Sequence, residues 1–249
     1  MCISLNMKNK KKHVLILGGS SDIGIEVVRS FLKLKWEVTA HLFKNKKKLL
    51  KLKRDNKNLN LVKLDLSNFN NSNIEILIKK KFNNKYDSII NLIGYVDNKS
   101  FEKTNFKSIL KSVIANAILP ILIEKLLVKK MISQRWGRIL NCSSIGVKFG
   151  GGKNTYNYSF SKHCLEFIPS SYKSWAKKNV LINNLRIGVT NTKIHKKMKR
   201  KKFKMKKRLK LIPINRMAEP KEISDYIVNL TTESNSYMTG QTLTVSGGE

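Results

Sequence analysis

Short apolar runs alternate with longer amphipathic segments along almost the whole chain. Strand-like runs, several of them continuously apolar, occupy His13–Leu17, Glu37–Phe43, Leu59–Leu64, Tyr86–Ile93, Gly137–Cys142, Val180–Ile187 and Thr242–Val245. Helical spacing of apolar residues is found in Ile23–Lys33, Ile74–Phe82, Phe106–Lys130, Tyr158–Lys178 and Lys221–Leu230. Continuously apolar strands that alternate with helices are typical of a parallel sheet covered on both faces. The pattern therefore predicts an α/β fold, a doubly wound parallel sheet of about seven strands with helices on both faces.

The 249 residues suit a single large domain. We find no linker and no internal repeat, so we expect one domain over residues 13–249, preceded by a basic N-terminal extension over residues 1–12. Three cysteines (Cys2, Cys142 and Cys164) lie far apart and form no CxxC pair, which argues against a disulfide framework or a structural zinc site. The four histidines show no metal-ligand spacing, and we expect no metal.

Segments that would direct the chain to a membrane are not apparent. The longest apolar run, Ile118–Val128, has 11 residues and contains Glu124 and Lys125, whereas a bilayer needs ~20 residues. The N-terminus has no apolar stretch of signal-peptide length. We therefore expect a soluble cytoplasmic protein without a membrane partner.

The net charge of +34 is extreme for a chain of this size. Two blocks are dense: Lys44–Lys57 holds eight basic residues and one acid, and Lys193–Lys210 holds twelve basic residues and no acid. Clustered cations can mark a nucleic-acid-binding surface. The excess is spread along the chain, however, and Lys, Asn and Ile, which have A/T-rich codons, are all abundant. We favour compositional bias and a solvated surface over a selected polyanion partner, and nucleic acid is not the partner we expect.

The first strand-like run leads directly into a glycine-rich turn followed by a helix. Glycines at such a turn let the backbone approach a pyrophosphate, and the helix N-terminus supplies amide groups and a positive dipole end. The same sequence also suits an ordinary tight turn, and its place after the first strand of an alternating chain favours the nucleotide interpretation. The candidate cofactor-binding residues of this turn are Gly18, Ser20, Ser21, Asp22, Ile23 and Gly24.

The end of the second strand bears on the choice of cofactor. An acid at this place would hold an adenine ribose hydroxyl and repel a 2′-phosphate. The sequence after Ala40 has no acid in reach, and Lys44, backed by Lys46–Lys48, is placed to pair with a 2′-phosphate. We therefore favour NADP(H) over NAD(H).

The most specific pattern lies in the middle of the chain. A strand ends in Ser143-Ser144, and Tyr158 and Lys162 follow at a spacing of four, which puts both on one face of a helix. A nearby ammonium would lower the pKa of the tyrosine toward neutrality and make it a general acid for a ketone oxygen. Ser144 would hydrogen-bond the same oxygen. Tyr156 lacks a lysine four residues on, since Phe160 stands there.

With these residues in view, the chain resembles the short-chain dehydrogenase/reductase family over roughly Lys11 to Gly248. The resemblance implies a Rossmann fold in which Ser144, Tyr158 and Lys162 are catalytic, Asn116 positions a water that relays protons to Lys162, and a nicotinamide cofactor donates hydride to a carbonyl. It further assigns cofactor contacts to a set of residues outside the first turn. These are Asp65 and Leu66 near the adenine, Asn91 and Gly94, Tyr158 and Lys162, Gly188, and Thr192 near the nicotinamide.

The pattern most resembles 3-oxoacyl-[acyl-carrier-protein] reductases. That resemblance implies a β-ketoacyl thioester on an acidic carrier as substrate, Arg135 and Lys178 as carrier contacts, a substrate lid at about 193–211, and a homotetramer or dimer. Three alternatives stay open: reduction of another small ketone or a sugar-derived substrate, a polyanion-binding or regulatory protein without turnover, and a cofactor-binding scaffold without activity.

Several positions depart from the family pattern. Leu17 replaces a threonine, Asp22 a glycine, and Ile187 a proline, and the Asn91–Gly94 motif keeps only its outer residues. Pro169 falls inside the helix expected from Tyr158, where it would kink the axis. None of these changes removes a group that hydride transfer needs.

Overall fold

The computed structural model describes residues 11–43, 47–65, 74–197 and 202–249. Seven strands form one sheet in the order β3-β2-β1-β4-β5-β6-β7, and every neighbouring pair is parallel. The strands are β1 (His13–Leu17), β2 (Glu37–Leu42), β3 (Leu59–Lys63), β4 (Ser88–Asn91), β5 (Gly137–Ser144), β6 (Val180–Ile187) and β7 (Thr242–Val245). The predicted doubly wound sheet of seven strands is therefore confirmed. The direction of winding reverses between β1 and β4, and in folds of this kind ligands bind in a crevice at this point, outside the carboxyl ends of the strands.

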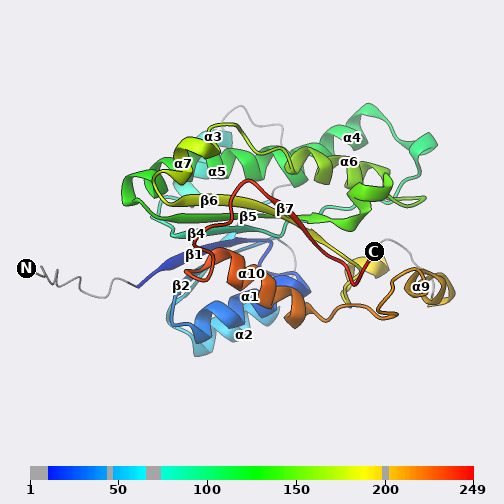
Figure 1. Ribbon diagram of the computed structural model, residues 1–249, viewed down its shortest axis with the longest axis horizontal. Coiled ribbons are helices and arrows are strands. Elements are labelled where there is room, and N and C mark those ends of the chain that lie inside the picture. The colour runs from blue at the N-terminus through cyan, green and yellow to red at the C-terminus, as the bar shows by residue number, and fades with distance from the viewer. Residues whose placement is uncertain (1–10, 44–46, 66–73, 198–201) are drawn as a thin grey trace, which may run out of the picture.

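Helices cover both faces of the sheet (Figure 1). On one face lie α1 (Asp22–Lys33), α2 (Lys47–Asp55) and α10 (Pro220–Thr231). On the other lie α3 (Ile74–Lys81), α4 (Phe106–Val113), α5 (Leu119–Gln134), α6 (Tyr156–Leu165) and α7 (Tyr172–Ala176). The short helices α8 (Ile194–Lys197) and α9 (Lys202–Leu209) lie in the segment expected to be the lid.

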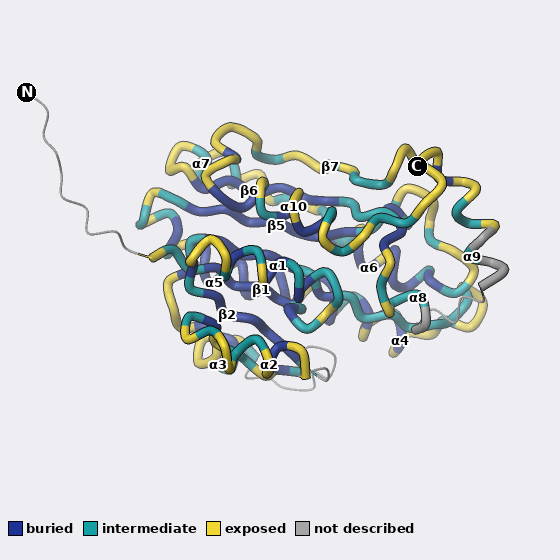
Figure 2. Tube along the Cα trace, turned by 90° about the horizontal axis from the view of Figure 1, so that it is seen from below, coloured by how far each residue is buried: buried dark blue, intermediate teal, exposed yellow. Residues whose placement is uncertain are grey.

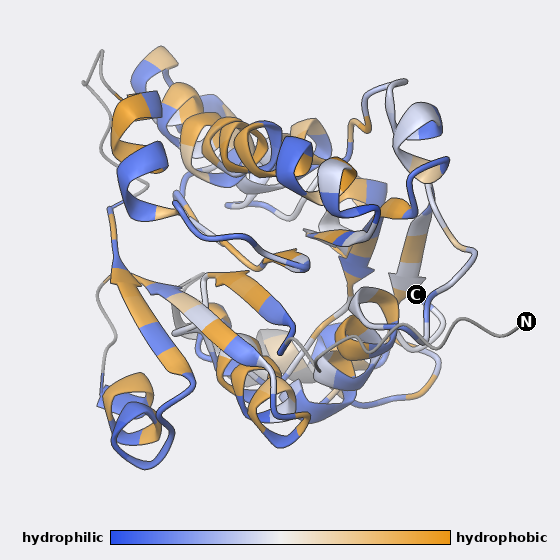
Figure 3. Ribbon diagram, turned by 90° about the vertical axis from the view of Figure 1, so that its left-hand side faces the viewer, coloured by the Kyte–Doolittle hydropathy of each residue, from blue (hydrophilic) through white to orange (hydrophobic). Residues whose placement is uncertain are grey.

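The core is divided by the sheet into two apolar layers. Val14 and Ile16 of β1 pack with α1 and α10, whereas Leu15 and Leu17 pack with α5 on the opposite face. Figure 2 shows the central strands as deeply buried, whereas the edge strands β3 and β7 are partly exposed, and Figure 3 shows hydrophobic residues on the strands and on the helices at either side. Because both faces of the central sheet are covered, β1 and β4 are mostly apolar without alternation, which helped the sequence pattern to locate them.

The predicted long helix at Phe106–Lys130 extends to Gln134 and contains a π-helical turn, η2 (Ile114–Ile118), between α4 and α5. The continuous stretch Phe106–Gln134 is long and apolar enough to cross a membrane by length and composition, and 44% of its most apolar window is buried in the structure. This corrects the expectation from uninterrupted apolar runs, because that count stops at Glu124 and Lys125. The apolar side of α5 packs against the sheet, as expected of a core helix.

The helix predicted over Tyr158–Lys178 is wrong in its second half. Helix α6 ends at Leu165, and α7 begins only at Tyr172. Pro169 lies between the two helices. It interrupts the predicted helix because a proline lacks an amide donor and disfavours helical backbone in the residue before it. The sequence analysis also missed α2, whose residues Lys47–Asp55 were interpreted only as a charge block.

Candidate active site

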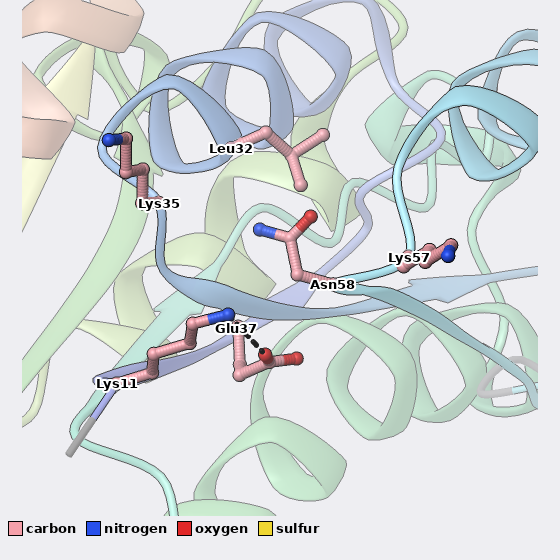
Figure 4. Close-up of a pocket in the computed structure, with 6 residues that line it drawn as sticks. All are labelled: Lys11, Leu32, Lys35, Glu37, Lys57 and Asn58. Atoms are coloured by element: carbon pink, nitrogen blue, oxygen red, sulfur yellow. Dashed lines mark ion pairs between the residues drawn. The ribbon is translucent and has the colours of Figure 1, made fainter.

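The residues singled out by sequence gather at the carboxyl ends of β1, β4, β5 and β6. A separate surface hollow, lined by lysines, Leu32, Glu37 and Asn58, lies at the amino end of β2 and contains Lys11 and Lys35 (Figure 4). Glu37 is the first residue of β2, so this hollow is at the opposite end of the sheet from the crevice. The candidate active site is therefore built on the strand ends and not on that hollow.

The turn after β1 requires glycine at two positions. Gly18 has φ +78°, and a Cβ there would lie 2.7 Å from the Leu92 carbonyl oxygen. A Cβ on Gly24 would lie 2.6 Å from the Gly18 carbonyl oxygen, so α1 can approach the turn only because this residue is glycine. The Ser21 side chain caps α1 by accepting a hydrogen bond from the Gly24 amide. The amides of Asp22 and Ile23, in the first turn, have no intrahelical acceptor and face the crevice end of the helix.

His41 at the end of β2 supports the turn, a role that the sequence analysis did not assign. Its Nδ1 accepts a hydrogen bond from the Gly18 amide at 3.2 Å, and its Nε2 lies 2.9 Å from the Leu64 carbonyl oxygen. These partners require the neutral tautomer with the proton on Nε2, and burial lowers the pKa of His41 accordingly. Asp65 is close enough to oppose that shift, which places it beside the predicted nucleotide crevice.

Tyr158 and Lys162 lie on one face of α6, as their spacing predicts. Both side chains are buried, with Tyr158 8% exposed and Lys162 2% exposed. The Lys162 ammonium donates to the Ile93 carbonyl at 2.7 Å and to the Cys142 carbonyl at 2.6 Å. These two carbonyls, at the ends of β4 and β5, hold Lys162 in place.

Ser144 ends β5 and accepts a hydrogen bond from the Gly146 amide at 3.1 Å. A hydrogen bond with Ser144 also acts on the Tyr158 hydroxyl, where it lowers the tyrosine pKa against a larger effect of burial. Gly94 stands beside the same hydroxyl, since a Cβ built on it would lie 4.0 Å from that oxygen. The three predicted catalytic side chains are thus brought together at one place.

The pKa values differ from the sequence-based expectation. Burial raises the pKa of Tyr158 to about 12 and lowers the pKa of Lys162 to about 8. The expected lowering of the tyrosine pKa by the lysine is therefore wrong for the protein without a ligand, because desolvation by burial outweighs the hydrogen bond with Ser144, which lowers this pKa. Burial thus favours the neutral form of both side chains, the protonated phenol of Tyr158 and the uncharged amine of Lys162.

Asn116 lies in the π-helical turn, which displaces it from the regular spiral of the helix. Its amide nitrogen donates to the Tyr95 carbonyl at 2.8 Å and to the Ser161 hydroxyl at 2.9 Å, and its oxygen accepts from the Tyr95 amide at 2.7 Å. The side chain thereby ties the segment after β4 to the catalytic helix, one residue before Lys162. The predicted water relay through Asn116 stays a prediction.

A buried polar chain runs behind the β4 end of the site. Asn91 accepts from the Ile93 amide at 3.1 Å and donates to Asn141 at 3.3 Å, and Asn141 donates to Glu124 at 3.4 Å. Burial raises the pKa of Glu124 to about 8. Asn91 is fully buried in this chain, so the structure shows it shaping the turn that carries Ile93 and Gly94, and its predicted contact with the cofactor stays a prediction.

The segment after β6 closes the other side of the crevice. Gly188 allows a close approach to β7, since a Cβ there would lie 2.5 Å from the Ser246 Cα. The Thr192 hydroxyl donates to the Thr190 carbonyl at 3.3 Å. Asp22 accepts a hydrogen bond from the Lys193 amide at 2.8 Å, and Ile194 follows with its Cδ1 3.7 Å from a Cβ built on Gly94. Sequence reasoning had no signal for either contact.

Some predicted residues are not brought to this place. Arg135 and Lys178 are exposed just before β5 and β6, at the amino ends of these strands. Ser144 is at the opposite end of the eight-residue β5, about 23 Å away at the usual strand rise. Within one chain the predicted carrier contacts are therefore remote from Tyr158. Lys44 and Leu66 lie outside the described residues.

A doubly wound sheet, a glycine-dependent turn at its switch point, and buried tyrosine and lysine beside a strand-end serine define a Rossmann-type oxidoreductase site. Comparison with known proteins gives the family. The family model described as enoyl-(acyl carrier protein) reductase matches residues 18–249. The chain belongs to the short-chain dehydrogenase/reductase family of oxidoreductases, as the motifs indicated.

Curated relatives and solved structures agree with this assignment. The chain is 30% identical to a 3-oxoacyl-[acyl-carrier-protein] reductase FabG of Aquifex aeolicus (strain VF5) over 187 residues, or 70% of this chain and 74% of the relative. It is 26% identical to an acetoacetyl-CoA reductase of Acinetobacter sp. (strain RA3849) over 247 residues, covering 96% and 98%. The fold is that of a 3-oxoacyl (acyl-carrier-protein) reductase of Agrobacterium tumefaciens C58, with a TM-score of 0.83 at 20% identity over 96% and 94% of the two chains.

Proposed function

We propose that the protein reduces a carbonyl to a secondary alcohol with NADPH. The observation that carries the proposal is the joint placement of Ser144, Tyr158 and Lys162 beside the glycine-dependent turn after β1. A binder without turnover has no need for a buried lysine held by two carbonyls on the same helix face as a buried tyrosine. The alternative of a polyanion-binding protein accounts for the surface lysines and leaves this buried arrangement unexplained.

The residues present fit a dinucleotide. Gly18 and Gly24 let the turn pack tightly against the Leu92 backbone and against the start of α1, and the amides of a helix N-terminus attract a pyrophosphate. The turn with Ser21 and Ile23 would hold the phosphates, while Gly188 and Thr192 would border the nicotinamide. A bound nicotinamide cofactor supplies the hydride for the carbonyl carbon.

The protein's own groups then manage the carbonyl oxygen. Tyr158, whose pKa of about 12 keeps it protonated, donates its proton to the oxygen as negative charge develops there. Ser144 hydrogen-bonds the same oxygen and orients it. Lys162, with a pKa of about 8, can supply a proton near neutral pH to restore the tyrosine, and two carbonyls hold its side chain in place.

We propose NADPH over NADH because no acid stands at the described end of β2 to repel a 2′-phosphate. Lys48 of α2 reaches this region, with its ammonium 3.4 Å from Asp22 at the phosphate turn. A Lys48→Glu variant should lower the ratio of NADPH to NADH affinity. Lys57→Glu, at the far end of the same basic block, is the matched control and should leave the ratio unchanged.

As substrate we propose a β-ketoacyl thioester, with an acyl carrier protein as the partner that delivers it. Support comes from the names of the relatives in Aquifex and Agrobacterium and from the basic segment after β6, which suits an acidic carrier. Another small ketone is the second candidate. The acetoacetyl-CoA reductase relative favours a thioester without a carrier protein.

We also propose that the chain forms a homodimer or homotetramer. Apolar residues are exposed on neighbouring parts of the helices that flank the site, namely Leu110 on α4, Ile118 and Ile121 around the start of α5, and Phe160 on α6. The four side chains would be buried by a second copy. Sedimentation analysis at several protein concentrations tests this part of the proposal.

The test of function separates binding from turnover. NADPH and NADH are titrated by fluorescence, and NADPH oxidation is then followed with an acetoacetyl thioester, with and without acyl carrier protein. Turnover that prefers NADPH and increases on the carrier-bound thioester is the expected result. Binding without turnover would redirect the search to other ketones, and the failure to bind either nucleotide would refute the oxidoreductase proposal.

A further inference from the structure

Asp22 bridges the two halves of the fold across the mouth of the crevice. It is the first residue of α1, in the first half, and its Oδ2 accepts the Lys193 amide of the segment after β6 at 2.8 Å. Its Oδ1 faces the Lys48 ammonium at 3.4 Å. Both carboxylate oxygens are therefore turned to partners outside the phosphate turn, although a glycine is expected at this position in the family.

The partner of this bridge is directly connected to the reaction centre. Ile194 follows Lys193, and its Cδ1 lies 3.7 Å from a Cβ built on Gly94, which itself would be 4.0 Å from the Tyr158 hydroxyl. The Ile194 side chain and the Tyr158 hydroxyl, which meets the substrate oxygen in the proposed function, therefore both lie next to Gly94. Whatever holds the Lys193 amide also limits where Ile194 lies.

We propose that Asp22 is a positioning residue that sets Ile194 as one wall of the carbonyl pocket, at some cost to cofactor affinity. The inference rests on the proposed function and deepens it. The carboxylate lies at the helix N-terminus, where the phosphates of a dinucleotide are attracted, so its negative charge opposes them. It also engages Lys48, which would otherwise be available to a phosphate. Asp22 therefore favours an ordered pocket for the substrate and weakens the hold on the cofactor.

Removing the Asp22 side chain should strengthen the binding of the cofactor and weaken the binding of the carbonyl substrate. In Asp22→Ala, NADPH should bind roughly threefold more tightly, from the loss of a repulsive charge at a helix end. The KM for the carbonyl substrate should increase about fivefold, equivalent to one hydrogen bond, with kcat within about twofold. General damage to the fold would weaken both ligands, so this pair of changes identifies positioning.

A measurement on the free protein tests the bridge without any activity. Hydrogen exchange of the Lys193 amide should be about fivefold faster in Asp22→Ala, since its acceptor is lost. Asp22→Asn keeps an oxygen acceptor and removes the charge. It should retain slow exchange and a near-normal KM while still binding NADPH more tightly.

Two further variants complete the design. Glu26→Gln, one turn further along α1, removes a carboxylate that pairs with Arg29 on the surface, and it should change none of these values. Ile194→Ala should itself raise KM for the carbonyl substrate. Adding Asp22→Ala to it should then raise KM no further, because the effect of Asp22 passes through Ile194.

The outcomes separate the two proposals. Suppose that the wild-type protein binds NADPH and reduces the thioester. The inference alone would then be overturned if Asp22→Ala changed neither the exchange rate of the Lys193 amide nor the KM, or if its effect on KM were fully additive with that of Ile194→Ala. A wild-type protein that neither binds NADPH nor reduces a carbonyl would overturn the proposed function, and the positioning role would be refuted with it.

Discussion

At the scale of single residues, the site combines groups that the sequence identifies with groups that only folding brings to them. Ser144, Tyr158 and Lys162 were predicted because the helical spacing and the strand-end serine are local patterns. The carbonyls of Ile93 and Cys142 that hold Lys162 were not, since a backbone acceptor has no signature in sequence. His41 is a further example, because its hydrogen bond to Gly18 joins residues 23 positions apart.

The hydroxyl of Tyr158 is expected to be indispensable for turnover. Tyr158→Phe should reduce kcat by at least about a hundredfold, since it removes the general acid. NADPH affinity should stay within a few-fold of the wild type, measured by fluorescence titration. Tyr156→Phe is the matched control, because the Tyr156 ring packs on Phe101 and Phe160 on the outer side of α6 and should not affect kcat. Equal losses in the two variants would contradict the assigned roles.

Glu124 should make the stability of the protein depend on pH. Its pKa of about 8 in the folded protein, against about 4.3 when unfolded, means that the folded state keeps a proton that the unfolded state releases. Stability from this group is therefore fully present below about pH 4 and is lost as pH rises toward 8.

Glu124→Gln removes this loss. The difference in free energy of unfolding between Glu124→Gln and the wild type should shift in favour of the variant by on the order of 3 kcal/mol from pH 5 to pH 8. Urea unfolding at the two pH values measures the difference. Glu75→Gln, which removes a surface carboxylate near Lys125, should show no such change between the two pH values. A pH-independent difference between Glu124→Gln and wild type would show that Glu124 is ionised in the fold.

At the scale of elements, the strands could be predicted and some helix ends could not. Both faces of β1, β4 and β5 are covered, so burial imposes a continuous apolar run that is visible in sequence. Helix α2 has no such signature, since Leu49 is its one buried residue among lysines. The π-helical turn at Asn116 is likewise set by packing between α4, α5 and α6 and leaves the apolar spacing almost unchanged.

Pro169 distinguishes the predicted kinked helix from the observed break. In a helix interior the proline would cost about 3 kcal/mol, so Pro169→Ala would stabilise the protein by a similar amount. Between α6 and α7 it is exposed and restricts the unfolded chain, so the same substitution should destabilise by about 0.5 kcal/mol. Thermal and urea unfolding measure the sign of the change in stability caused by Pro169→Ala. A clear stabilisation would favour the continuous helix over the observed break.

At the scale of the whole molecule, the net charge of +34 should affect the rate at which the protein meets a charged partner more than the rate of the chemical step. Attraction between a basic reductase and an acidic carrier is screened over about 8 Å at physiological salt. The kcat/KM for a carrier-bound thioester should therefore decrease steeply as salt is raised. The kcat/KM for the same acyl group on a small neutral thioester should stay nearly constant. Parallel salt series that coincide would remove the electrostatic argument for a carrier protein.

The fold class and the family could be read from the chain because motifs at four strand ends occur in the order that the topology demands. The substrate could not, since we propose that it is selected by the side chains around Tyr158, Ile194 among them, and by surface charge. Neither of these follows a local pattern.

The central claim is that Ser144, Tyr158 and Lys162 form a working site for carbonyl reduction. The most direct test follows NADPH absorbance in a single turnover of an acetoacetyl thioester, with the wild type and Tyr158→Phe side by side, both saturated with NADPH. We expect the wild type to oxidise its bound NADPH and the variant to retain it. NADPH oxidation at equal rates in both proteins, or binding of NADPH with no oxidation by the wild type on any ketone, would contradict the claim.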